Sequence, residues 1–151
     1  MELSDFLQPP HVLLGLKTRD KAQLLSEISR RAGEALTTDP QVIEAALAAR
    51  ERLGSTGLGS GFALPHARIP GIERFFGWFA RLARPIDFQA IDDKPVDLVF
   101  LLLIPDAGGI SHVGALAAIS RRLRDVGVVE HRRKVHDPAD AYALLTRNGA
   151  S

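Results

Sequence analysis

Cysteine is absent from this chain of 151 residues, which excludes a disulfide framework and any metal site built on thiolates. An excess of charge of either sign is also absent, because 19 basic and 18 acidic side chains leave a formal net charge of +1. Proteins whose main ligand is nucleic acid usually carry a concentrated basic excess. We therefore expect no nucleic-acid partner.

Long hydrophobic runs are missing as well. The longest apolar run, residues 98–105, is too short to cross a bilayer, so we expect no membrane insertion. The first five residues, Met-Glu-Leu-Ser-Asp, lack the basic and apolar regions of a signal peptide. Together with the lack of cysteine, which fits a reducing compartment, these absences predict a cytoplasmic protein.

The composition is that of a protein with one hydrophobic core. Hydrophobic residues make up 46% of the sequence and charged residues 25%, and no repeat, low-complexity segment or obvious linker interrupts it. A chain of this length can bury a sizeable core within one domain. We therefore expect a single domain over residues 1–151.

Segments typical of strands alternate with segments typical of helices. The expected strands cover residues 12–16, 62–64, 75–82 and 97–104, with a turn over residues 105–109. The expected helices follow capping signals at Thr18, Asp39-Pro40, Ser111 and Asp137-Pro138. The unbroken apolar run over residues 97–104 suits a central strand covered on both faces. Strands interleaved with helices predict an α/β layered domain.

Helical spacing predicts which side chains of each helix face the core. In chain order these are Leu25, Ile28, Ala32 and Leu36; Val42, Ile43, Ala46 and Leu47; Val113, Leu116, Ala117, Ser120 and Leu123; and Ala141, Leu144 and Leu145. Arg50 lies three residues past Leu47 on the same side of the second helix, which Gly54 ends. The arginine therefore lies beside the segment that follows.

That segment, residues 54–61, is rich in glycine and hydroxyl groups and leads through a short apolar stretch to His66. Glycines permit positive φ angles and close approach of the backbone, so successive N–H groups can converge on an anion. Neither the Walker A spacing nor the dinucleotide fingerprint is present. Pro65 cannot donate to a sheet, so we expect the chain to turn there and to hold His66 at a sheet edge. This layout suits a histidine presented to a phosphoryl group, and an ordinary turn beside a surface histidine is the alternative.

Several separated motifs occur in one order from about residue 4 to residue 146. They are Arg-Glu-Arg-Leu-Gly-Ser-Thr-Gly-Leu-Gly (50–59), Ala-Leu-Pro-His (63–66), Pro-Ile-Asp-Phe (85–88), Ala-Ile-Asp-Asp-Lys-Pro-Val-Asp-Leu-Val-Phe (90–100), Ile-Pro (104–105) and a histidine at the head of a helix, His112. In this order they resemble the fructose/mannitol-type enzyme IIA domain of the bacterial phosphoenolpyruvate-dependent phosphotransferase system. The Gly-Ser-Thr-Gly and Asp-x-x-Pro-Val-Asp-Leu patterns most resemble its stand-alone nitrogen-regulatory type.

The resemblance implies a mixed parallel and antiparallel sheet of about five strands with helices on both sides. It also implies a phosphotransferase without a cofactor, which receives phosphate from an HPr-like carrier (HPr or NPr) and has regulatory target proteins. By their match to the family motif, His66 is the phosphorylated residue, His112 donates to the phosphoryl oxygens and Arg50 assists the transfer. The phosphate-binding residues are completed by the hydroxyls and amides of Ser55, Thr56 and Gly57.

Other interpretations stay open at this point. A sugar-specific IIA would pass its phosphate to a IIB partner, whereas a regulatory binding module would use phosphorylation only as a switch. His66 and His112 could instead be metal ligands, but no third ligand has diagnostic spacing, so we expect no metal site. His11, His131 and His136 match nothing in the motif and are expected at the surface.

The chain departs from the family pattern around both histidines. Phe62 stands where a small aliphatic residue is usual, Ala67-Arg68 where Gly-Lys is common, and Val113-Gly114 where leucine is typical. A glycine in the first turn loosens a helix, so we expect His112 to be held less rigidly. Because residues around the phosphorylated histidine form the docking surface, these departures bear on the choice of partner.

Overall fold

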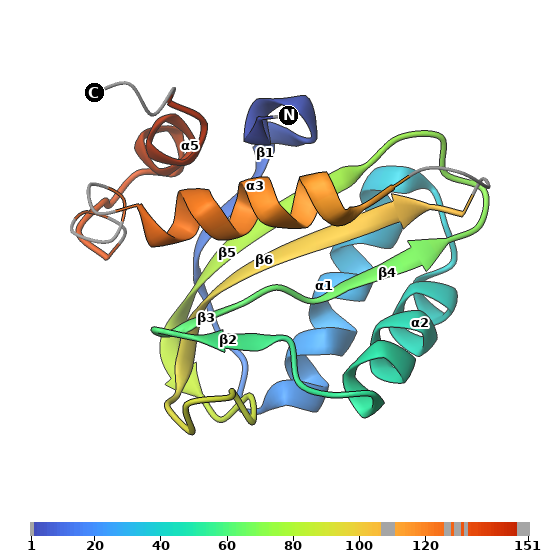
Figure 1. Cartoon of the computed structure of the whole chain (residues 1–151), viewed down its shortest axis with the longest axis horizontal. Helices are drawn as coiled ribbons and strands as arrows, with labels where there is room; N and C mark the ends of the chain where they lie inside the picture. The colour runs from blue at the N-terminus through green and yellow to red at the C-terminus, as the bar shows by residue number, and fades with distance from the viewer. Residues whose placement is uncertain (1, 107–110, 126–127, 129–130, 132, 148–151) are drawn as a thin grey trace.

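The computed structural model describes residues 2–106, 111–125, 128, 131 and 133–147, and it folds them into α/β layers (Figure 1). The strands are β1 (Leu7–Leu16), β2 (Gly57–Gly59), β3 (Phe62–Ala63), β4 (His66–Ile69), β5 (Phe76–Ile86) and β6 (Val96–Pro105). The helices are the 3-10 helix η1 (Leu3–Asp5) and the α-helices α1 (Lys21–Leu36), α2 (Pro40–Arg52), α3 (Val113–Arg124) and α5 (Pro138–Thr146). Within these described ranges, every helix is too short or too polar to span a membrane.

The strands form one mixed sheet in the order β1-β5-β6-β3-β2, and β4 also pairs with β6. The pairs β1–β5, β3–β6 and β4–β6 are parallel, whereas β5–β6 and β2–β3 are antiparallel. The four expected strands are confirmed, although β1 begins at Leu7 rather than at residue 12. The expected mixed sheet is confirmed too, with six strands in place of about five.

Pro65 divides one line of pairing along β6 into β3 and β4. Phe62 pairs with Leu98 and His66 pairs with Leu102, in both cases in parallel. Proline has no N–H to donate, so the ladder stops there, while its carbonyl still accepts from the N–H of Leu102 at 3.0 Å. The expected turn is therefore a break in pairing, after which the chain continues in the same direction and His66 becomes the first residue of a new strand.

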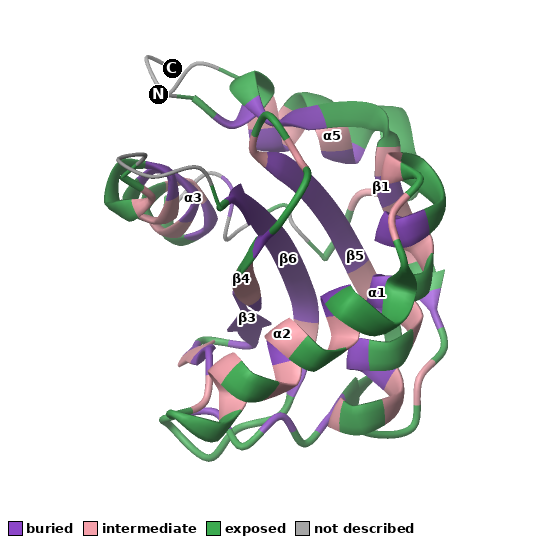
Figure 2. Cartoon of the chain, turned by 90° about the vertical axis from the view of Figure 1, so that its right-hand side faces the viewer, coloured by how far each residue is buried: buried purple, intermediate pink, exposed green. Residues whose placement is uncertain are grey.

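The central strand β6 contributes to two hydrophobic cores, one on each face of the sheet (Figures 1 and 2). Val99, Leu101 and Leu103 pack in the core with α1 and α2, and Leu98, Phe100, Leu102 and Ile104 pack in the core with α3 and α5. All of these side chains are at most 1% exposed. Because side chains alternate along a strand, one that is covered on both faces must be apolar throughout, as the sequence predicted.

Two of the expected helix caps are confirmed and one is wrong. Asp39 and Asp137 each accept a hydrogen bond from the amide two residues on, at 2.9 and 2.7 Å. The cap of α1 is Asp20, whose carboxylate accepts from the N–H of Gln23 at 2.8 Å. Thr18 does not cap this helix, because it lies two positions before the residue from which a side chain reaches the first free amides.

The expected inward faces of α1, α2 and α5 are confirmed at their central residues. Leu25, Ile28, Ala32, Ile43, Leu47, Ala141 and Leu145 are all buried. Val42 is 40% exposed, so its placement in the core was wrong. Ile43 and Leu47 lie four residues apart and already form the stripe that packs, which turns Val42 toward the edge of the contact.

The face of α3 that packs against the sheet is not the expected one. Its buried residues are Ala115, Ala118, Ile119 and Leu123, of which the sequence predicted only the last. Val113 is 67% exposed. The helix carries two adjacent apolar stripes of equal spacing, so periodicity could not choose between them. The predicted face opens instead onto a cavity beside His66.

The start of α3 lies one residue from the expected cap. His112 occupies the N-cap position, and the hydroxyl of Ser111 accepts a long hydrogen bond of 3.4 Å from the N–H of Val113. The turn expected over residues 105–109 falls largely outside the described residues.

A buried ion pair joins α1 to the end of α2. The ammonium of Lys21 lies 2.9 Å from a carboxylate oxygen of Glu51, and their side chains are 16% and 6% exposed. The same carboxylate accepts from the N–H of Thr56 at 3.0 Å and from its hydroxyl. The Lys21 ammonium also lies 4.5 Å from the ring centre of Phe88. Glu51 therefore fixes the loop between α2 and β2, residues 53–56, which we call the site loop.

Replacing one partner of this pair should destabilise the fold. In Lys21→Met the buried carboxylate of Glu51 loses its counter-ion, and we expect the free energy of unfolding to fall by about 3 kcal/mol. Urea denaturation of the wild type and the variant measures this change. Lys17→Met is the matched control, because Lys17 is exposed in the connection between β1 and α1. It should change stability by less than about 0.5 kcal/mol. Equal stability of the two variants would contradict a structural role for the pair.

Candidate functional site

The ring of His66 is oriented by the backbone that precedes it. Its Nδ1 atom lies 2.8 Å from the carbonyl oxygen of Leu64. A carbonyl can only accept, so Nδ1 carries the proton and donates it in this contact. The neutral ring then has an unprotonated Nε2, which bears the lone pair. His66 is half-buried and begins β4, so the sheet holds its backbone while Leu64 holds its ring.

A cavity of about 390 Å³ lies beside His66, between the site loop and α3. Its lining residues are Arg50, Ser55, Thr56, Leu58, Leu64, His66, Val113, Leu116, Ala117 and Ser120. The structure thus brings Arg50, Ser55 and Thr56 together with His66, as the sequence predicted. The cavity wall contributed by α3 is mostly apolar, so the site has one polar side and one apolar side.

The surroundings of His66 favour its neutral form. Burial is the largest influence and lowers the pKa of the imidazole, and the positive charge of Arg50 and the proximity of His112 lower it further. The hydrogen bond to Leu64 and the carboxylate of Glu51 act in the opposite direction without reversing the shift. The net effect is a pKa below the ordinary histidine value. The Nε2 lone pair is therefore available at neutral pH.

His112 approaches His66 from the start of α3. The two ring centres are 6.4 Å apart and the ring planes are inclined by 32°. The Nδ1 atom of His112 lies 3.1 Å from the Nη2 atom of Arg68, whose Nη1 donates to the carbonyl of Pro105 at 3.3 Å. The two histidines predicted for the site are therefore neighbours, although 46 positions separate them in the sequence.

Arg68 is the residue at this site that the motif did not assign. The sequence showed it only as a departure from the common Gly-Lys that follows the histidine. A second signal was present, because residues i and i+2 of a strand lie on one face, and Arg68 is two residues after His66 in β4. The sequence did not predict a strand over residues 66–69, and without that strand the spacing does not place Arg68 beside His66.

Arg50 lies in the last turn of α2, and its Nη1 donates to the carbonyl of Gly54 at 2.9 Å. A cation at this end of a helix compensates the partial negative charge of the free carbonyls. The contact holds the guanidinium over the site loop, on the wall of the cavity that contains His66. Arg50 thus brings a positive charge close enough to lower the pKa of that histidine.

The hydroxyls of the site loop make contacts within the protein. Thr56 is 2% exposed and its hydroxyl donates to Glu51. The hydroxyl of Ser55 donates to the carbonyl of Phe88 at 3.0 Å and accepts from the N–H of Gly57 at 3.0 Å. These three predicted phosphate-binding residues therefore shape the loop in this structure, and a role in binding phosphate stays a prediction.

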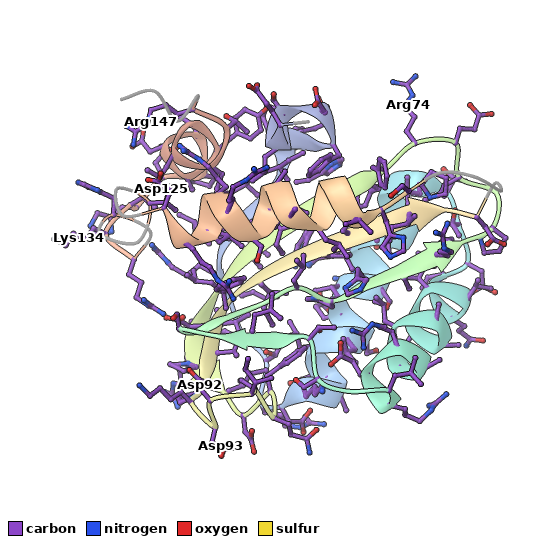
Figure 3. All side chains as sticks on the ribbon, in the orientation of Figure 1. Arg74, Asp92, Asp93, Asp125, Lys134 and Arg147 are labelled. Atoms are coloured by element: carbon purple, nitrogen blue, oxygen red, sulfur yellow. The ribbon has the colours of Figure 1, made fainter. Side chains whose placement is uncertain are left out.

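The glycine-rich run forms a β-hairpin instead of one continuous loop. Ser60 and Gly61 both have positive φ angles, 57° and 85°, as in the turns that join adjacent antiparallel strands. This turn lies beside Asp92, whose carboxylate accepts from the N–H of Ser60 at 3.1 Å (Figure 3). Gly57 serves close packing, because a Cβ there would lie 2.8 Å from Ala90. The glycines thus support the edge of the sheet that leads to His66.

The remaining histidines lie elsewhere. His131 and His136 are exposed, as expected. The expectation for His11 was wrong, because it is half-buried with its ring centre 4.8 Å from that of Phe76. In the described part of the chain, no group of three or more histidine, aspartate or glutamate side chains is arranged to hold a metal ion.

Comparisons with known proteins agree with this geometry. Residues 5–148 match the family described as "Phosphoenolpyruvate-dependent sugar phosphotransferase system, EIIA 2". The nitrogen regulatory protein of Bradyrhizobium diazoefficiens is 42% identical over 145 residues, which cover 96% of this chain and 95% of that protein. The crystal structure of nitrogen regulatory protein IIA-Ntr from Neisseria meningitidis superposes with a TM-score of 0.88 at 31% identity, over 95% of this chain and 99% of that one.

A second solved structure shows the same fold in a complex. It is enzyme IIAMTL of Escherichia coli bound to phosphorylated enzyme IIBMTL, with a TM-score of 0.76 at 18% identity, over 93% of this chain and 98% of that one. At 18% identity, this similarity shows a common fold and nothing more. The family match and the more similar relatives span nearly the whole chain, which therefore belongs to the EIIA type 2 family of the phosphotransferase system, as a phosphotransfer component similar to nitrogen regulatory proteins of the IIA-Ntr type.

Proposed function

We propose that His66 accepts a phosphoryl group on Nε2 from a histidine-containing phosphocarrier of the HPr or NPr kind, and that the phosphorylated protein regulates target proteins in the cytoplasm. The observation that carries this proposal is the contact between Nδ1 of His66 and the Leu64 carbonyl at 2.8 Å. It leaves one nitrogen of a neutral ring as the nucleophile. The lowered pKa of His66 supports the same assignment.

The step is a transfer between two imidazoles. The Nε2 lone pair of His66 attacks the phosphorus, and the N–P bond to the carrier's histidine breaks with its electron pair returning to that ring. No water enters and no net proton is required, because each ring keeps one proton on the nitrogen that is not bonded to phosphorus, so that the carrier's histidine leaves as a neutral imidazole; in His66 that nitrogen is Nδ1, in contact with Leu64. The transition state places charge on the equatorial phosphoryl oxygens, so positioned donors and cations accelerate it.

Two residues beside His66 have the chemistry to stabilise that charge. Arg50 presents a guanidinium on the cavity wall, whose planar fork can donate to two oxygens at once. His112, with its ring centre 6.4 Å from that of His66, can donate from Nε2. The amides of the site loop and of Gly57, held by Ser55 and Thr56, would complete the binding of the phosphate.

The apolar side of the cavity supports docking of a protein partner. Val113 is 67% exposed on one side of it, and Leu53 in the site loop is 84% exposed. Apolar side chains of this size next to a reactive group favour a protein surface as the donor over a small molecule. A regulatory role is favoured over sugar transport because relatives that match nearly the full length at 34% to 42% identity are nitrogen regulatory proteins, whereas the mannitol IIA matches at only 18% identity.

Phosphorylation can be tested directly. We expect intact-protein mass spectrometry, after incubation with phosphoenolpyruvate, enzyme I and a phosphocarrier, to show one acid-labile gain of phosphate mass. The gain should vanish in His66→Ala and should form about a hundredfold more slowly in His112→Ala, which loses one donor to the transition state. ³¹P–¹⁵N coupling in the phosphoprotein should place the phosphate on Nε2.

The outcome also separates the alternatives. No gain with several cognate carriers would contradict the phosphotransfer role and leave a binding module. Transfer onward to a IIB protein would indicate a sugar-specific IIA. A target whose affinity changes on phosphorylation would indicate the regulator that we propose.

The protonation of His66 gives a second prediction. Burial and nearby positive charge lower its pKa, so an NMR titration should show His66 gaining its proton at a lower pH than a histidine in an unstructured peptide. Protonation blocks Nε2, so the rate of phosphorylation should fall as the pH is lowered through the midpoint of the His66 titration. Arg50→Met removes a positive charge and should raise the midpoint, whereas Arg52→Met, exposed on the same helix end, should leave it unchanged. A midpoint at or above that of the peptide would contradict the described environment.

A further inference from the structure

Arg68 links β4, the end of β6 and the start of α3 through its guanidinium. Its Nη2 lies 3.1 Å from Nδ1 of His112, and its Nη1 lies 3.3 Å from the carbonyl oxygen of Pro105. Arg68 pairs with Ile104 in the parallel ladder between β4 and β6, so its backbone is fixed by the sheet. The guanidinium therefore extends from a fixed strand to a histidine that lies 44 positions further along the chain.

The chemistry of arginine sets the direction of this hydrogen bond. A guanidinium remains protonated in proteins and has five N–H donors but no acceptor. Nδ1 of His112 must then be the acceptor and carries no proton while the contact exists. The single N–H of the neutral His112 ring is on Nε2, the nitrogen that can donate to a phosphoryl oxygen.

His112 has little else in the described structure to orient its ring. It occupies the N-cap position of α3, but its side chain makes no capping hydrogen bond. Gly114 follows in the first turn, where a Cβ would meet no heavy atom within 4 Å, so this glycine leaves the helix start loosely packed. An anchor from another element would compensate for that looseness, and Arg68 is in contact with the ring.

We propose that Arg68 is a positioning residue for phosphoryl transfer, which fixes His112 in the tautomer with its proton on Nε2. This inference rests on the proposed function, since the tautomer matters only if His112 donates to the phosphoryl group. Arg68 itself acts through His112, and its second contact with Pro105 holds the fork in the orientation that the ring requires.

The first experiment reads the tautomer without any phosphotransfer. ¹⁵N NMR of the imidazoles in the unphosphorylated protein should show His112 with an unprotonated Nδ1. Arg68→Met keeps the length of the side chain but removes its donors, and should give a mixture of the two tautomers. Arg68→Lys should retain part of the preference through a single donor. Arg74→Met is the matched control, because Arg74 is exposed in the connection between β4 and β5 and points away from the molecule (Figure 3). An unchanged His112 spectrum in Arg68→Met would overturn the proposal.

The second experiment measures the effect on transfer. We expect Arg68→Met to slow the phosphorylation of His66 by about tenfold without weakening carrier binding, and Arg68→Lys to recover part of the rate. In a His112→Ala background, Arg68→Met should cause no further loss, because the two residues act as one unit.

Additive losses would overturn the proposal and indicate that Arg68 contacts the phosphoryl group directly. Absence of phosphorylation in the wild type would contradict the proposed function, and the NMR result would still decide whether Arg68 sets the tautomer.

Discussion

The pairing of two short strands along β6 is the constraint on which the site depends. β6 is buried on both faces, so its position is fixed by two cores at once. β3 and β4 take their place from it, and Pro65 interrupts the ladder between them. At this interruption the carbonyl of Pro65 accepts from the N–H of Leu102, and the carbonyl of Leu64 accepts from the ring of His66. A rigid strand thus places the backbone of the reactive residue, and the carbonyl of Leu64 orients its ring.

The electrostatics of the site follow from what surrounds that ring. Burial and positive charge act on the imidazole in the same direction, and both oppose a proton on it. The same positive charge suits a phosphoryl group, which is anionic in every state of the reaction. An environment that is unfavourable to the protonated histidine is therefore favourable to the phosphorylated one. Arg50 contributes to both effects from the end of α2.

Side chains in and next to the site loop hold it in place. Glu51 uses its carboxylate to bind Lys21 and Thr56, which ties the first turn of α1 to the loop. Ser55 ties the loop to Phe88 through its hydroxyl. These contacts hold the loop against the sheet, so that the cavity wall opposite α3 is preformed. Residues that a motif marks as phosphate-binding can thus act first by maintaining the shape of the site.

The sequence by itself determined much of this protein. The apolar run over residues 97–104 required a central strand, the Asp-Pro pairs specified two helix starts, and the order of separated motifs indicated the family and His66. These features are local, because they depend on a residue and its near neighbours along the chain. The tertiary structure decided the rest. It determined which stripe of α3 faces the core, that the hydroxyl of Thr56 donates to Glu51, and that Arg68 contacts His112. Each of these depends on how elements far apart in the sequence are placed relative to one another, and that placement is fixed only when the two cores close on the sheet.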